Sequence, residues 1–156
     1  MIKRPPDTFH IHPDVQSALR LGLPVVALES AVITHGLPYP QNLNTAQELE
    51  DLIKDHGVTP ATIALVDRIL NVGTTREELE RLATGTHLLK ISTRNMAIGM
   101  VQKKSGGTTV ASTLKAASTA EIKIFATGGI GGVHRGNPFD VSADLNALAE
   151  NPVVVV

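Results

Sequence analysis

The sequence contains no cysteine and no tryptophan, and aromatic residues make up only 3% of its 156 residues. Without cysteine it can have no disulfide framework, no thiolate metal site and no cysteine nucleophile. Acidic and basic residues nearly balance, 15 against 14, so there is no broad positive field to bind a nucleic-acid backbone. Few rings could stack on bases, namely Tyr39, Phe9, Phe125 and Phe139. These shortages argue against a disulfide-rich, thiolate-dependent or nucleic-acid-binding protein.

Long hydrophobic runs are also missing. No apolar stretch approaches the roughly 18 residues that a transmembrane helix needs, and the first residues lack the apolar core of a signal peptide. We therefore expect a cytoplasmic protein that does not act on membranes. Hydrophobic residues still make up 42% of the chain and charged residues 19%, which is typical of a globular domain and not of a disordered or fibrous chain.

The chain alternates short apolar segments with amphipathic ones. Apolar, β-branched runs predict strands, whereas apolar residues spaced by three or four positions predict helices. The predicted strands cover residues 25–28, 62–66, 69–72, 88–91, 122–126 and 153–156, and the predicted helices cover 13–21, 41–56, 75–82, 95–103, 108–120 and 142–150. Because most of these strands are continuously apolar and alternate with helices, we predict an α/β fold with a largely parallel sheet flanked by helices.

We divide the chain into an N-terminal segment, residues 1–12, and an α/β region, residues 13–156. Residues 1–10 are expected to be loosely structured because Pro5 and Pro6 oppose regular structure. The sequence stops within a run of four valines, its most strand-like segment. A strand buried on both faces normally leads into a covering helix, so we expect the sheet to be incomplete at the C-terminus.

Glu29 is the first candidate for chemistry. It ends the apolar run 25–28, and a carboxylate in that position is partly desolvated. Desolvation raises the pKa of a carboxyl group and suits it to proton transfer. The same residue type at a strand end can also serve only to cap backbone amides, and both interpretations stay open.

Glycine-rich segments provide further candidates. Residues 127–136 follow a predicted strand and hold five glycines within nine residues, which lets the backbone approach a ligand closely. Their spacing matches neither the dinucleotide motif nor the phosphate loop, which disfavours a dinucleotide-binding oxidoreductase. A second glycine pair, in residues 106–109, precedes a predicted helix whose free amides could bind an anion or simply be capped. Lys90, at the end of another predicted strand, is a plausible phosphate partner.

Asp140 and Asp144 lie four residues apart at a predicted helix start, with Ser142 between them. Their oxygens could hold a hard cation, or they could cap the helix. Because Glu29, Lys90 and the loop from Thr127 all follow predicted strands, a parallel sheet would gather them at one edge, where α/β sheets bind ligands.

With these residues identified, the sequence closely resembles the pseudouridine-5'-phosphate glycosidases, also called the indigoidine synthase A-like family. The resemblance runs from about Pro13 to the last residue and covers roughly the first half of a typical member. It is carried by the segments VALES (26–30), HGLPYPQN (35–42), TPATIA (59–64), GTTVA (107–111), FATGGIGGVHRG (125–136) and FDVSADL (139–145).

The resemblance implies reversible cleavage of the C–C glycosidic bond of pseudouridine 5'-phosphate, giving uracil and ribose 5-phosphate. It implies that Glu29 is the proton donor and that Asp140 is a ligand of a divalent cation, typically Mn²⁺. The positions that match substrate contacts are Lys90, Val110, Ser142, Ala143 and Asp144. The expected partners are a small-molecule nucleotide and further copies of the chain, since family members are homotrimers.

One feature of the family has no counterpart here. The family's imine-forming lysine lies just beyond the final valine strand, and no lysine of this sequence occupies an equivalent place. Two hypotheses follow: a member of the glycosidase family, or a catalytically impaired, truncated homologue that binds ligand or assists assembly. Thr93 and Asn95 also replace an arginine and an aspartate that the family has near Lys90.

Overall fold

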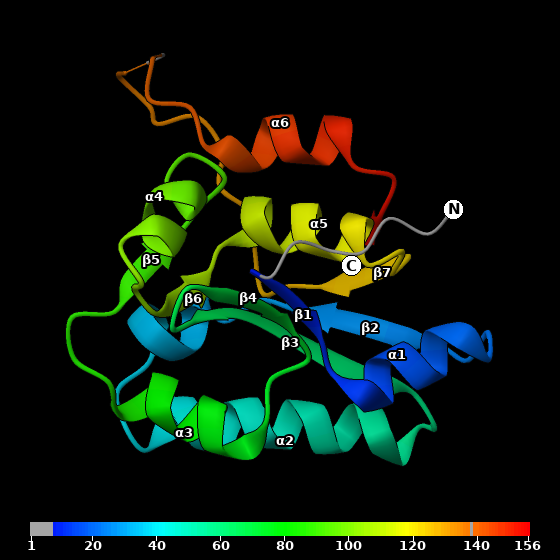
Figure 1. Cartoon of the computed structure of the whole chain (residues 1–156). Helices are drawn as coiled ribbons and strands as arrows, with labels where there is room; N and C mark the ends of the chain where they lie inside the picture. Colours follow the sequence, from blue (N-terminus) through cyan, green and yellow to red (C-terminus); the bar gives the residue numbers. More distant parts are fainter. Residues whose placement is uncertain (1–7, 138) are drawn as a thin grey trace.

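A computed structural model describes residues 8–137 and 139–156 (Figure 1). The strands are β1 (Phe9–Ile11), β2 (Val25–Leu28), β3 (Thr59–Val66), β4 (Ile69–Val72), β5 (Leu89–Ile91), β6 (Gly106–Thr108), β7 (Ile124–Ala126) and β8 (Val154–Val155). The helices are α1 (Pro13–Arg20), α2 (Gln41–Asp55), α3 (Arg76–Thr84), α4 (Met96–Val101), α5 (Val110–Thr119) and α6 (Ala143–Glu150), with a short π-helix, η1 (Val32–Gly36).

The eight strands of the described residues form one sheet. Its main path runs β1-β4-β3-β2-β7-β8, and β5 and β6 branch from it because β6 pairs with β3. The pairs β3–β4 and β3–β6 are antiparallel, whereas the other pairs are parallel. The prediction of a largely parallel α/β sheet is confirmed.

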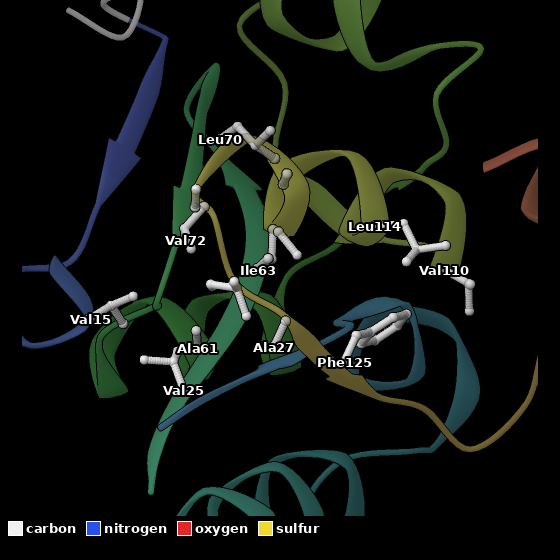
Figure 2. Packing of buried hydrophobic residues seen from close by; sticks show 14 of the residues in the cluster. Val15, Val25, Ala27, Ala61, Ile63, Leu70, Val72, Val110, Leu114 and Phe125 are labelled. Carbon is white, nitrogen blue, oxygen red and sulfur yellow. The ribbon is translucent and has the colours of Figure 1, made fainter. Parts of the chain in front are cut away.

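Helices cover both faces of this sheet. Figure 1 shows α2 and α3 below it and α5 above it, with α6 stacked on the outside of α5. The main core lies between the sheet and the upper layer, where Ile63, Leu114 and Phe125 are almost completely buried (Figure 2). On the other face, a smaller cluster of Ile33, Ala46, Leu79 and Ala83 joins η1, α2 and α3.

Several local predictions are confirmed closely. The strand 25–28 and the antiparallel strand 69–72 have the predicted bounds. Thr75 and Glu78 form the predicted capping box at the start of α3. Gly57, with φ of +72°, follows the end of α2, as expected for a glycine in the left-handed region.

Two local predictions are wrong. The chain predicted to be loose over residues 1–10 enters strand β1 at Phe9, and β1 pairs with β4; residues 1–7 of that prediction lie outside the described residues. Gly106–Thr108 is strand β6, so the helix predicted from residue 108 begins only at Val110. Residues 32–36, for which the sequence predicts no element, form η1.

The described residues include no helix both long and apolar enough to cross a membrane.

Candidate active site

The position of Glu29 depends on how two strands meet. β3 pairs with β2 through Thr62 and with β6 from Ala64, so β2 and β6 point toward each other along one side of β3. The carboxyl end of β2 therefore faces the carboxyl end of β6. Since β5 runs parallel to β6, with Lys90 opposite Gly107, this junction brings Lys90 near Glu29.

Buried hydroxyl groups hold the junction together. Ser30 Oγ donates to the Ile63 carbonyl at 2.6 Å and accepts from the Thr108 amide at 2.9 Å. Thr108 Oγ1 donates to the same Ile63 carbonyl at 2.5 Å. These bonds satisfy backbone groups of β3 and β6 that the interrupted ladder leaves unpaired. They fix the residue next to Glu29 in the sequence and thereby the start of the site.

Two cavities meet at Glu29. The first, of about 270 Å³, is lined by Ala31, Val32 and Gly36 and by the polar residues Glu29, His35, Lys90 and Thr109, and we call it the polar cavity for these side chains. The second, about 420 Å³, lies between η1, α2 and the loop after β7. Its wall is mostly apolar and includes Leu28, Val32, Ile33, Leu37, Ala46, Leu49 and Ala126, with Glu29, Thr45 and Thr127 among its polar residues. Glu29 thus borders a charged compartment and an apolar one.

Burial raises the pKa of the Glu29 carboxyl above its ordinary value. The hydrogen bond from Thr127 acts against this by stabilising the carboxylate, the Asp144 charge raises the pKa further, and the Lys90 charge lowers it. The net upward shift favours a carboxyl group that can keep its proton at higher pH than a solvated glutamate does. Such a group can act as a general acid.

Two carboxylates hold the first half of the glycine loop after β7. At its start, the Thr127 hydroxyl donates to Glu29 Oε1. Four residues later, the Gly131 amide donates to Asp144 Oδ2 at 2.8 Å. The other Asp144 oxygen accepts from the Ala111 amide at 2.9 Å, in the first turn of α5. The loop therefore bridges the predicted acid and the start of two helices.

The predicted substrate contacts gather around these helix starts. Val110, the first residue of α5, is buried. Ser142 caps α6 by accepting from the Asp144 amide at 3.2 Å, and Ala143 follows it as the first residue of α6. Asp144 is 8% exposed, and both its oxygens already bind backbone amides. Their roles as substrate contacts stay predictions.

The same contacts bear on the two interpretations of residues 106–109. At the start of α5 the Ala111 amide binds the Asp144 carboxylate, and Thr109, the N-cap residue, makes no side-chain cap hydrogen bond. The glycine pair has a packing cause, because a Cβ on Gly106 would lie 2.0 Å from the Leu89 carbonyl oxygen and one on Gly107 would lie 2.3 Å from Thr34 Oγ1. Only glycine lets β6 approach β5 and η1 this closely.

Asp140 lies apart from the buried network, on the exposed segment after the glycine loop. Its Oδ2 contacts His134 Nδ1 at 2.5 Å. Among residues 8–137 and 139–156, no three His, Asp or Glu side chains are placed to share a metal ion. Asp140 can therefore supply one carboxylate to a hard cation that takes its other ligands from water or substrate, but these residues do not form a closed metal cage.

The structure also adds residues that the sequence analysis missed. His35, which has no role in the sequence analysis, is exposed and also lines the polar cavity with Glu29 and Lys90. Thr127 was noted only as part of a glycine loop, and Ser30 received no role. The sequence gives only a weak signal for these three residues, because one hydroxyl or imidazole group after a strand does not show which side chain it will contact in the fold. The motif stretches VALES and HGLPYPQN, which contain Ser30 and His35, were the available clue.

Comparisons with known proteins identify relatives of this chain. The family model described as indigoidine synthase A like protein matches residues 14–156. The chain belongs to this family. It is 49% identical over 158 residues to a pseudouridine-5'-phosphate glycosidase of Escherichia coli (strain K12), an alignment covering 99% of this chain and 51% of that protein. It is 52% identical over 145 residues to the enzyme of the same name from Roseobacter denitrificans, covering 92% of this chain and 47% of that protein.

Solved structures of the family show the same fold. The prealnumycin C-glycosynthase AlnA, in complex with ribulose 5-phosphate, superposes with a TM-score of 0.86 at 36% identity, covering 97% of this chain and 50% of that one. An indigoidine synthase A-like protein from Thermotoga maritima gives 0.84 at 28% identity, covering 94% and 48%. This family member thus spans about half the length of the relatives that it matches.

Proposed function

We propose that this chain contributes the proton-donor half of a pseudouridine-5'-phosphate glycosidase site. The reaction is the reversible cleavage of the C–C glycosidic bond, giving uracil and ribose 5-phosphate. The observation that carries the proposal is the position of Glu29, a half-buried acid with a raised pKa between the polar cavity of Lys90 and the apolar cavity. The identity to enzymes of that name supports the choice of substrate.

The two cavities suit the two ends of this substrate. An anionic phosphate is attracted to the Lys90 ammonium, and the Thr109 hydroxyl can donate to it in the same cavity. The faces of the planar base are less polar than its edges. They can pack against aliphatic side chains of the apolar cavity such as Val32, Ala46 and Leu49. In this orientation the sugar and the bond to be broken lie at Glu29.

Glu29 then acts as the general acid. Cleavage of a C–C bond needs an electron sink at the sugar carbon, and the resemblance assigns this role to a lysine amine that forms an imine with the opened ribose. The family's lysine has no equivalent in this sequence, so the amine comes either from another lysine or from outside these 156 residues. The protonated Glu29 carboxyl gives its proton to the sugar oxygen whose bond to C1' breaks as that amine bonds to C1'. Partial burial supports this role, because it keeps the carboxyl protonated and limits its contact with water.

We also propose that Mn²⁺ binds to the Asp140 carboxylate. The Asp140 carboxylate would be a ligand of this cation, and a divalent cation there would neutralise negative charge on the substrate. We further propose that the chain is cytoplasmic and that it assembles into homotrimers, the state that the family resemblance implies.

The proposal is tested by uracil release from pseudouridine 5'-phosphate with added Mn²⁺, using the 156-residue chain and its Glu29→Gln variant. Turnover that falls by about 100-fold or more in the variant supports the proposal. The same preparations are titrated with ribose 5-phosphate by calorimetry, with Lys90→Met as the binding variant. Lys104→Met, an exposed lysine outside both cavities, is the matched control.

Binding that needs Lys90, without turnover, supports the second hypothesis, a homologue that binds ligand or assists assembly. A folded chain that neither releases uracil nor binds ribose 5-phosphate would overturn both hypotheses.

A further inference from the structure

Thr127 is the residue that connects the predicted acid to the glycine loop. It directly follows β7, and its amide donates to the Val156 carbonyl at 3.0 Å, which fixes its backbone beside β8. Its hydroxyl donates to Glu29 Oε1. Thr127 Oγ1 in turn accepts from the Gly129 amide at 3.2 Å. Thr127 therefore stands in the middle of a chain of hydrogen bonds from the loop backbone to the Glu29 carboxyl.

This hydroxyl has only one proton to give. The Gly129 carbonyl lies 3.1 Å from Thr127 Oγ1 and could accept it, but the Glu29 carboxylate lies closer and is the stronger acceptor when ionised. The amide of Gly129 polarises the hydroxyl in the same direction, because hydrogen bonds in a chain strengthen one another. The Thr127 hydroxyl therefore donates its hydrogen bond to Glu29 while the glycine loop keeps this conformation.

The charged groups around Glu29 do not replace this contact. Lys90 on β5 and Asp144 on α6 act on the Glu29 charge with opposite sign. His35 on η1 lines the same polar cavity, and its Nδ1 lies 2.7 Å from Thr34 Oγ1. Within the described residues, Thr127 is the one side chain that hydrogen-bonds to Glu29.

We infer that Thr127 is the positioning residue of this site, holding the Glu29 carboxyl at the boundary between the two cavities and coupling its orientation to the glycine loop. The inference deepens the proposed function and rests on it for the role of Glu29 as the acid. Its consequence is that the carboxyl points in one direction before substrate arrives. The hydroxyl also favours the carboxylate and so limits how tightly Glu29 holds its proton.

The test compares Thr127→Val, which keeps the shape but removes the hydroxyl, with Thr127→Ser, which keeps the hydroxyl. The Glu29 carboxyl is titrated directly by carbon NMR in the full chain, without substrate. We expect its pKa to rise in Thr127→Val and to return toward the wild-type value in Thr127→Ser. Thr119→Val is the matched control, because its hydroxyl binds only the Lys115 carbonyl on the surface of α5.

Uracil release adds a second readout. We expect kcat to fall by about 10- to 100-fold in Thr127→Val, the range that loss of one hydrogen bond to a charged group predicts. KM should change little, and the pH profile should move toward higher pH with the Glu29 titration. Thr127→Ala replaces the valine variant if circular dichroism shows that the latter does not fold.

The two proposals fail differently. An unchanged Glu29 titration in Thr127→Val, or a serine variant as impaired as the valine variant, would overturn the inference. A shifted titration in a chain without uracil release would confirm that Thr127 positions Glu29 and would count against the proposed function.

Discussion

At Glu29, burial and hydrogen bonding act on one carboxyl group in opposite directions. Burial raises its pKa, and the Thr127 hydroxyl and Lys90 lower it again. A solvated glutamate would be a poor proton donor near neutral pH, and a completely buried one would exchange its proton only with difficulty. The half-buried position is a compromise suited to proton transfer, and it should cost the fold some stability.

That cost gives a prediction on pH. Because the pKa of Glu29 is raised above 4.5 in the folded chain, the folded state binds this proton more tightly than the unfolded state does. Its contribution to stability is therefore lost as the pH rises from about 4.5 through the raised pKa. Glu29→Gln removes the ionisation, so we expect the stability of the variant relative to wild type to increase between acidic and neutral pH. Urea unfolding at a series of pH values measures this, and a difference independent of pH would contradict it.

Among the elements, β6 shows where prediction from sequence failed. The sequence predicts a helix from Thr108 with the Gly106-Gly107 pair before it, and it gives no strand signal there because glycine has low strand propensity. Tertiary contacts override this preference, since β6 fits between β3, β5 and η1 only without side chains at Gly106 and Gly107. The strands 25–28 and 69–72 were predicted correctly because they are short, β-branched and apolar.

We therefore expect Gly107→Ala to be strongly destabilising. The added Cβ would lie 2.3 Å from Thr34 Oγ1 and 2.5 Å from the Ser30 carbonyl oxygen, and a backbone carbonyl in a buried junction cannot move away at low cost. The expected loss in the free energy of unfolding is about 3 kcal/mol or more. Gly132→Ala is the control, since no atom lies within 4 Å of its added Cβ, and it should change stability by less than about 0.5 kcal/mol. Equal losses in both variants would refute the packing explanation.

On the scale of the whole molecule, the sheet exposes an apolar edge. β8 is the last strand on the main path, and it pairs only with β7 among the described residues. Val154 on β8 is 63% exposed, and the neighbouring Val156 and Ile124 are exposed as well. Exposed edge strands offer unpaired backbone groups and apolar side chains to other chains.

We expect this edge to drive self-association of the 156-residue chain. Val154→Lys places a charge on the edge and should lower concentration-dependent association in sedimentation velocity. Val101→Lys, at an 83% exposed position on α4, makes the same chemical change away from any sheet edge. If both variants lower association equally, general surface hydrophobicity and not the β8 edge is responsible.

The sequence by itself determined the α/β class, most element types and the identity of Glu29 and Lys90 as candidates. These depend on local patterns, namely apolar periodicity, capping residues and the short segments between the periodic ones. Tertiary structure decided which candidates meet. Glu29 and Lys90 approach each other because β2 and β6 end face to face along β3, a non-local pairing that no local pattern encodes. A second non-local pairing places Thr127 beside Glu29, since β7 pairs with β2 and the residue after β7 lies at the same edge of the sheet.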